Sequence, residues 1–270
     1  MKPTAAYLAG LGAWALVGTM LLAARPAAPT RRAASRLLSA PPKKAAARKL
    51  LTGVAAQDFW RHHNLASLWQ LNAQQGGRPQ PGFFGREGFK IEFALLQVQR
   101  VAGQPHLYRV EGKTRCLKNI AVPFSGLIML RQVYRVPVEA GQPATYTVVG
   151  SFEFEEARIA RNTGTYRGSV AVDLTNLDGG PLSYAAVAGS PANFCGYKFD
   201  GQWRSTGGDV ERVVWAAEWR TLAQQLFEDF EVGDRMPAIN RKYADRGWSN
   251  YWENDEWWAD SPAAGAGLSI

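Results

Sequence analysis

The sequence predicts an all-β, mainly antiparallel protein, in which a β-meander of about eight to ten strands is closed or nearly closed into a barrel, with one or two C-terminal helices packed on it. Three observations support this prediction. Five segments between residues 106 and 206 alternate apolar and polar residues around a glycine. The linkers between them are short and hydrophilic, and after residue 217 the apolar spacing changes from that of a strand to that of a helix.

The five segments each carry one glycine on their apolar parity. The same-parity positions are Val110, Gly112 and Thr114; Phe124, Gly126, Ile128 and Leu130; Val148, Gly150, Phe152 and Phe154; Tyr166, Gly168, Val170 and Val172; and Phe199, Gly201 and Trp203. Such alternation is typical of strands with one buried and one solvated face. Glycine on the buried face leaves room for a sheet to curl, and short linkers favour antiparallel hairpins over parallel crossovers.

The N-terminus carries a charge-free apolar run at residues 5–24, which follows Lys2. Residues 1–25 are therefore expected to be a signal peptide or a membrane anchor. The run is followed by Arg25, Arg31 and Arg32. In a retained anchor these charges would lie on the exported side, whereas positive charges beside a membrane span are preferentially kept in the cytoplasm. This conflict favours a removed signal peptide. We expect an exported protein that is periplasmic, at the cell surface or extracellular, with inner-membrane anchoring through residues 5–24 as the alternative.

Positive charge is concentrated before the predicted domain. Residues 1–50 hold nine Lys or Arg and no Asp or Glu, which leaves 22 cations against 23 anions in the rest of the chain. Residues 26–50 are rich in Ala, Pro, Arg and Lys without apolar periodicity, so they are predicted to be a disordered linker. The nearly neutral remainder lacks the basic stripe of a nucleic-acid-binding protein, and no nucleic-acid partner is expected.

Residues 51–261 are expected to form a single domain. Its opening stretch is ambiguous: Leu65, Leu68, Trp69 and Leu71 could line a helix, but strands at residues 58–63 and 67–72 before a glycine-containing turn are the favoured interpretation. A glycine-rich turn at residues 81–88 then leads into a long predicted strand at residues 89–100.

The C-terminal part changes to a helical pattern. One helical face gathers Trp219, Leu222, Leu226, Phe227 and Phe230. The helix is expected to lie across the sheet or plug an open end, with Leu127 and Met129 as its seat. A second helix is predicted between Asn240 as N-cap and Gly247 as C′ residue. Residues 262–270 are expected to be a disordered tail.

Cys116 and Cys195 lie on segments assigned to the same meander. They could form a disulfide in an exported protein, or they could be two small buried apolar residues, which is the favoured interpretation.

Candidate ligand-binding residues gather near the C-terminus: Trp248, Trp252, Trp257 and Trp258 with Asp255 and Glu256, to which we add Trp203. Exposed tryptophan faces stack on apolar ligand surfaces, while carboxylates bind hydroxyl groups. The alternative is that these tryptophans fold back and seal the barrel, and it is favoured here.

Catalytic motifs of the common nucleotide, zinc and serine-hydrolase classes are absent from the sequence. No catalytic residue, metal site or cofactor is expected. Glu153 and Glu155 share one face of a predicted strand roughly 6 to 7 Å apart, near the separation used in glycoside hydrolysis. They lie on the polar parity, however, and should face water.

Several motifs together resemble an uncharacterised family of predicted exported bacterial β-rich proteins. They are Gly82-Phe83-Phe84-Gly85 with Lys90-Ile91-Glu92-Phe93, Tyr108-Arg109-Val110-Glu111-Gly112-Lys113, Phe199-Asp200-Gly201-Gln202-Trp203, and the run from Ile239-Asn240-Arg241-Lys242-Tyr243 through Gly247-Trp248 to Trp258. This resemblance implies export and a shared β architecture, and it supplies no catalytic residue. The Phe59-Trp60 pair and the meander are also similar to lipocalin-like (calycin) barrels.

The expected function is a non-catalytic exported cell-envelope module for binding or structure, whose partner is a small molecule, a glycan or an envelope protein. One alternative is a lipocalin-like carrier of a small apolar ligand, which requires an internal cavity. A second is a carbohydrate-active enzyme with paired carboxylates.

Overall fold

A computed structural model describes residues 47–71, 77–159, 163–176, 180–233 and 238–259. Residues 44–270 group into one compact unit. The predicted signal peptide or anchor, the predicted linker up to residue 46 and the predicted tail at residues 262–270 lie outside the described residues. Lys49 and Leu50 form the first strand, so the last two residues of the predicted linker belong to the sheet.

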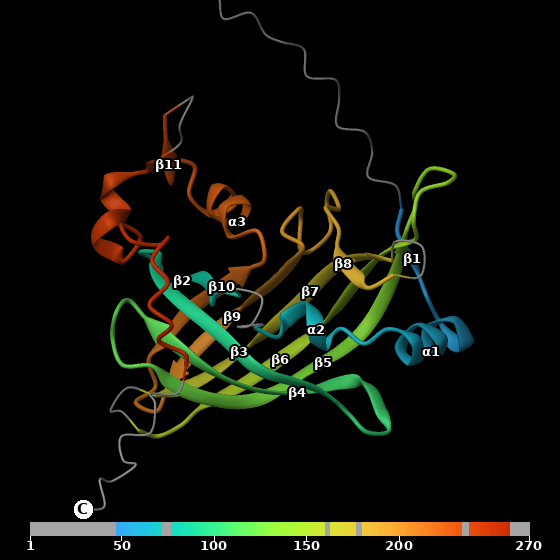
Figure 1. Cartoon of the computed structure of the whole chain (residues 1–270), viewed down its shortest axis with the longest axis horizontal. Helices are drawn as coiled ribbons and strands as arrows, with labels where there is room; N and C mark the ends of the chain where they lie inside the picture. Colours follow the sequence, from blue (N-terminus) through green and yellow to red (C-terminus); the bar gives the residue numbers. More distant parts are fainter. Residues whose placement is uncertain (1–46, 72–76, 160–162, 177–179, 234–237, 260–270) are drawn as a thin grey trace, which may run out of the picture. The chain divides into compact units, whose positions relative to one another are not determined.

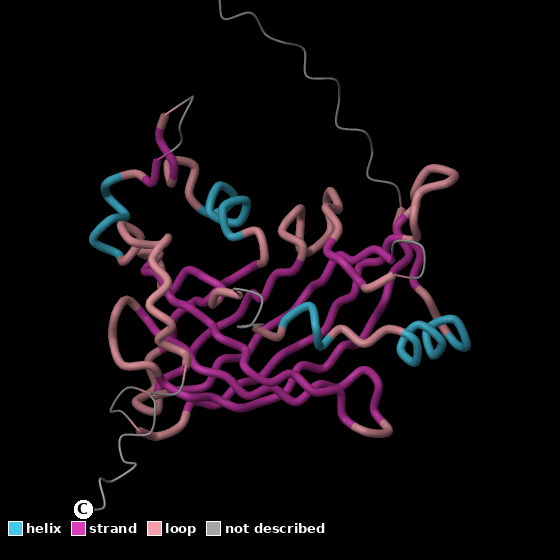
Figure 2. The backbone as a smooth tube through the Cα atoms, in the orientation of Figure 1, coloured by secondary structure: helices cyan, strands magenta, loops and turns pink. Residues whose placement is uncertain are grey.

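One large antiparallel sheet dominates the fold (Figures 1 and 2). Its strands are β1 (Lys49–Leu50), β2 (Gln80–Phe84), β3 (Phe89–Val101), β4 (Gln104–Cys116), β5 (Val122–Val136), β6 (Thr145–Glu156), β7 (Gly164–Asn176), β8 (Leu182–Tyr184), β9 (Tyr197–Ser205) and β10 (Val210–Ala216). The order is β1-β5-β4-β3-β2-β10-β9-β7-β6, with β8 on β7, and pairing of β5 with β6 completes a ring of eight strands. The predicted fold class is confirmed, and the barrel is nearly closed.

The five glycine-containing segments are neighbours in this ring, as predicted. They lie on β4, β5, β6, β7 and β9, and Gly168 stands directly opposite Gly201. A Cβ atom at Gly168 would lie 2.5 Å from the Cα of Gly201 and would overlap the carbonyl oxygen of Asp200. The strands can approach this closely only because both positions lack a side chain, which allows the sheet to curl.

The ring closes between the short strand β2 and β10, where Gly82 pairs with Trp215 and Phe84 with Val213. A Cβ atom at Gly82 would lie 2.6 Å from the Cβ of Trp215. Glycine is therefore required where the two ends of the meander meet.

Aromatic side chains fill the middle of the barrel. The fully buried Trp215 ring lies between Phe93, at a centroid distance of 3.9 Å, and Phe199, at 4.5 Å, and stacks on both. Phe152 meets the edge of the same indole at 5.2 Å. The barrel therefore has no continuous central channel through this layer.

The predicted opening hairpin is wrong. Its residues form two helices, α1 (Gly53–His62) and α2 (Ala66–Trp69). Phe59, Leu65 and Trp69 are buried in the same apolar cluster as the inward strand residues. The backbone N–H of Leu65 donates to the hydroxyl of Tyr108 on β4 at 3.1 Å. Short helices leave most of their terminal backbone groups without intrahelical partners, and the barrel supplies some of these. The backbone N–H of Leu71, for example, donates to the carbonyl of Leu95 on β3 at 2.8 Å.

The predicted C-terminal helix is present as α3 (Trp219–Leu226), and Leu222 and Ala223 are its buried residues. It is shorter than predicted: Phe227 and Phe230, assigned to its apolar face, lie beyond its end. The surface predicted to pack against this helix is wrong. Leu127 and Met129 remain 41% and 36% exposed, and α3 instead covers a second apolar cluster that includes Phe83 and Val214 of β2 and β10.

The remaining regular elements are the small pair β11 (Glu231–Val232) and β12 (Ala238–Ile239), and the 3₁₀ helix η2 (Arg241–Arg246). The predicted caps of this last helix are confirmed. Asn240 accepts a hydrogen bond from the backbone N–H of Lys242, and Gly247 has a φ of 88°. In the described part of the chain, no helix combines the length and apolar character needed to cross a bilayer.

Candidate functional site

A cavity of about 770 Å³ opens at the end of the ring where β4 ends and β5 begins. We call it the mouth pocket, and its lining is Phe84, Ile91, Thr114, Cys116, Lys118, Asn119, Ile120, Val122, Glu156, Tyr166, Trp203, Asp209 and Glu211. Most of the strand residues in this set have the inward parity of their strands, so the pocket continues the interior of the barrel beyond its filled aromatic layer.

Glu156 organises the floor of the mouth pocket. Its side chain is buried, and it accepts four hydrogen bonds. The donors are Thr114 Oγ1 at 3.0 Å, Tyr166 Oη at 2.7 Å, the backbone N–H of Gly164 at 2.8 Å and Trp203 Nε1 at 3.0 Å. They come from β4, β7 and β9, so this single carboxylate on β6 fixes three other strands at the mouth.

Burial and the charge of Glu156 raise the pKa values of two neighbouring acids. Burial, followed by the charge of Glu156, raises the pKa of Cys116 to about 11. Burial and Glu156 also raise the pKa of Tyr166 well above its ordinary value. Both groups are neutral near pH 7, and the Cys116 thiol lacks the thiolate character that nucleophilic chemistry requires.

The C-terminal residues 248–259, which we call the strap, run along the outer surface of β3 and β4. Trp248 is fully buried, stacks on Phe83 at 4.5 Å and donates its Nε1–H to the carbonyl of Gly88 at 2.8 Å. Trp258 is 5% exposed and Trp252 is 58% exposed. Trp248 and Trp258 therefore pack against the protein, and Trp252 is the exposed tryptophan of the strap.

A smaller cleft of about 300 Å³ lies between the strap and the start of β2, and we call it the strap cleft. The predicted residues Trp252, Trp257, Trp258 and Asp255 line it together. Trp203 lies in the mouth pocket instead, and Trp248 and Glu256 line neither cavity. Ligand binding by these residues stays a prediction.

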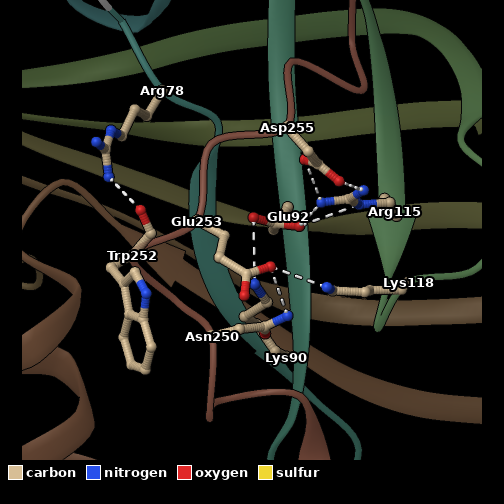
Figure 3. A network of polar contacts seen from close by, with 9 residues as sticks. All are labelled: Arg78, Lys90, Glu92, Arg115, Lys118, Asn250, Trp252, Glu253 and Asp255. Atoms are coloured by element: carbon tan, nitrogen blue, oxygen red, sulfur yellow. Dashed lines mark hydrogen bonds and ion pairs between the residues drawn. The ribbon is translucent and has the colours of Figure 1, made fainter.

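Charged side chains fasten the strap to the barrel (Figure 3). Arg115 is 8% exposed and lies between Glu92, with Nη2 to Oε2 at 3.0 Å, and Asp255, with Nη1 to Oδ2 at 2.6 Å. Lys118 Nζ contacts Glu253 Oε2 at 2.9 Å, and Lys90 Nζ contacts Glu92 Oε1 at 3.4 Å. Because Lys118 also lines the mouth pocket, the strap holds the β4–β5 loop at the rim of the pocket.

Asp255→Asn is expected to loosen the strap. Arg115 holds the pKa of Asp255 below its ordinary value, so this carboxylate stabilises the fold above its unfolded-state pKa, and the contribution is lost as pH falls through the lower folded-state pKa. The side chain is 46% exposed, so we expect a loss of about 1 kcal/mol or less at pH 7. Faster amide hydrogen exchange in residues 248–258 is the readout.

Glu256→Gln is the matched control, because the neighbouring Glu256 carboxylate is exposed and has no side-chain partner among the described residues. Equal exchange rates in the two variants would contradict a fastening role for Asp255.

The paired carboxylates and the two cysteines considered from the sequence do not form a site of their own. Glu153 and Glu155 are exposed on the outer face, as expected, and Glu153 forms an ion pair with Arg167 at 2.5 Å. Cys116 and Cys195 are both free thiols in different apolar clusters, so the structure does not contain the disulfide that was considered. Within the described ranges, no group of three His, Cys, Asp or Glu side chains is placed to hold a metal ion.

Sequence reasoning missed Glu156 and Glu211 as site residues. The signal was present in the parity: Glu156 follows Phe152 and Phe154 at intervals of two, and Glu211 precedes Val213 and Trp215 in the same way. A charge that continues an inward apolar series should lie at the barrel rim, facing in.

A larger groove of about 1010 Å³ lies over β5, β6, β7 and β9. Most of its lining belongs to the outward parity of these strands and includes Arg131, Ser169, Lys198 and Asp200. The mouth pocket is the better candidate because inward aromatic and aliphatic side chains surround it on several strands.

Comparison with known proteins gives no assignment: no family model, no curated protein sequence and no solved structure matches this chain.

Proposed function

We propose that this protein is a non-catalytic binding module of the cell envelope that takes a small ligand with an apolar body in the mouth pocket. The observation that carries the proposal is the cavity of about 770 Å³ at one end of the ring, lined by Phe84, Ile91, Val122 and Trp203. Small-ligand sites are typically concave, mainly apolar and furnished with a few fixed polar groups, often in the mouths of β-barrels.

The filled barrel centre favours a shallow site over the deep calyx of a lipocalin-like carrier. Phe93, Trp215 and Phe199 stack across the interior, so a ligand in the mouth pocket stops at this layer. Glu156 favours binding over catalysis, because both of its oxygens are occupied by protein donors. Its four hydrogen bonds preorganise the pocket instead.

Export belongs to this proposal and is supported by the apolar run at residues 5–24. A binding module placed in the periplasm, at the surface or outside the cell would meet ligands that the cytoplasm does not contain.

Titration with the neutral apolar fluorophore N-phenyl-1-naphthylamine tests the proposed function. The probe is expected to bind at one site with increased emission, and Val122→Trp, which adds an indole on the inward face of β5, is expected to weaken binding at least about tenfold by filling the pocket. Leu127→Trp is the control, since Leu127 lies on the outward face of the same strand and is 41% exposed. Equal binding by both variants would exclude the mouth pocket as the site.

A further inference from the structure

Glu211 lines the mouth pocket, and its carboxylate has no hydrogen-bond or ion-pair partner in the described part of the chain. It lies on β10 with the inward parity of Val213 and Trp215, and it pairs across the sheet with Trp203 on β9. The side chain is partly buried and lines the pocket. Among the described residues it makes no hydrogen bond and no ion pair. A carboxylate that gives up part of its hydration without receiving a donor is left to attract a ligand group.

The other charges around the pocket increase this attraction. Three carboxylates, those of Glu156, Asp209 and Glu211, line the pocket with a single ammonium, that of Lys118. Lys118 Nζ is already bound to Glu253 at 2.9 Å. Glu156 is saturated by four donors, and Asp209 accepts one hydrogen bond, from Ser205 Oγ at 3.3 Å. Neither Asp209 nor Glu211 has a cationic partner among the described residues, so the negative charge without a counterion lies on the β9–β10 side of the rim. A cleft lined by one sign of charge concentrates ions of the opposite sign.

Aromatic rings stand beside this carboxylate. Trp203, the cross-strand neighbour of Glu211, meets Phe84 in an edge-to-face contact at a centroid distance of 5.5 Å. Both rings line the pocket. The face of an indole or phenyl ring attracts a cation, most strongly when water is partly excluded. One side of the pocket thus combines the Glu211 carboxylate with two aromatic rings, and β5, across the ring of strands from β10, contributes Val122.

We infer that the mouth pocket is selective for a small organic ammonium ion with an apolar body. The ammonium group would pair with Glu211 next to the Trp203 and Phe84 rings, and the apolar body would contact Ile91, Ile120 and Val122. This inference rests on the proposed function and adds the charge and chemical class of the ligand. An anion of the same shape would meet Glu211 and Asp209 as like charges.

Three eight-carbon probes of matched length test the inference: octylammonium, 1-octanol and octanoate. Binding is followed at pH 7 and low salt through the indole N–H resonance of Trp203 in ¹⁵N-tryptophan-labelled protein, identified by its absence in Trp203→Phe. Octylammonium is expected to bind at least about tenfold more tightly than octanol, and octanoate more weakly than octanol, since a partly buried pair gains more than an exposed one. Salt should weaken only the octylammonium complex.

Glu211→Gln keeps the size of the side chain and removes its charge, so octylammonium and octanol should bind this variant with affinities within about threefold of each other. Glu155→Gln, an equal charge change on the exposed outer face, should keep the selectivity. Unchanged thermal midpoints in both variants show that folding is intact. Octanol binding as tightly as octylammonium would overturn the ammonium inference and leave the pocket standing. No shift of the Trp203 resonance with any probe would overturn the proposed function as well.

Discussion

Gly168→Val is expected to prevent folding or to lower the free energy of unfolding by more than about 3 kcal/mol. The added Cβ would overlap the carbonyl oxygen of Asp200 and lie 2.5 Å from the Cα of Gly201. Both atoms belong to the backbone of β9, so no side chain can rotate away. The only relief is to separate β7 from β9, which would break their ladder from Gly164 to Val172. Soluble yield and urea unfolding followed by circular dichroism measure the effect.

The matched control is Ser169→Val, one residue further along β7. Ser169 is exposed on the outward face, where a β-branched side chain suits a strand, so the change should stay within about 0.5 kcal/mol. A Gly168→Val protein as stable as the Ser169→Val protein would contradict the close approach of β7 and β9.

Trp215→Ala is expected to destabilise the protein by about 3 to 5 kcal/mol, the range for removal of a large buried aromatic side chain. The indole is fully buried between the rings of Phe93 and Phe199, so its loss leaves a cavity in the middle of the barrel. Trp215→Phe should cost much less. Trp215 Nε1 has no hydrogen-bond acceptor in the described part of the chain, so phenylalanine loses stacking area without losing a hydrogen bond.

Trp252→Ala provides the comparison for this second prediction. Trp252 is 58% exposed on the strap, so its removal should change the free energy of unfolding by less than about 1 kcal/mol. The shift of the urea unfolding midpoint at constant m-value measures the stability change in Trp215→Ala, Trp215→Phe and Trp252→Ala. A Trp215→Ala protein as stable as Trp252→Ala would contradict the filled barrel centre.

The strand ring could be predicted because its signal is local and repeated. Each glycine-containing segment alternates over several residues, and hairpin linkers make consecutive segments neighbours. The existence of α3 and the caps of η2 could be predicted for the same reason, since helical spacing and capping residues act within one or two turns. The end of α3 could not, because Phe227 and Phe230 continue the helical spacing beyond Leu226.

The opening helices could not be predicted from the pattern, because a short apolar run such as Leu65 to Trp69 fits both periods. Tertiary packing decides between helix and strand here, because Leu65 and Trp69 are buried in the apolar cluster of the barrel. The seat of α3 was equally inaccessible. It depends on which sheet face is left uncovered beside β2 and β10, and not on the apolar character of Leu127 and Met129.

Asp173 illustrates the limit of strand parity. It has the outward parity of β7, which predicts a solvated carboxylate, yet it is fully buried. Thr147 Oγ1 donates to its Oδ1 at 2.6 Å, and Ser190 Oγ donates to its Oδ2. Ser190 belongs to the long connection between β8 and β9, whose path the sequence does not specify. The mouth pocket could not be predicted from strand parity either, because it depends on the register of strands that are far apart in the chain.

The most direct test of the central claim, a ring of eight strands that opens at the mouth pocket, is a set of backbone nuclear Overhauser contacts in the isotope-labelled protein. The structure predicts cross-peaks between Gly168 and Gly201, and between Phe83 and Val214 across the closure of β2 with β10. Amides of β2 and β10 should also be protected from hydrogen exchange. Contacts that pair β2 with a strand other than β3 and β10, or β10 with a strand other than β2 and β9, would contradict the ring and with it the mouth pocket. Rapid exchange along both strands would contradict it as well.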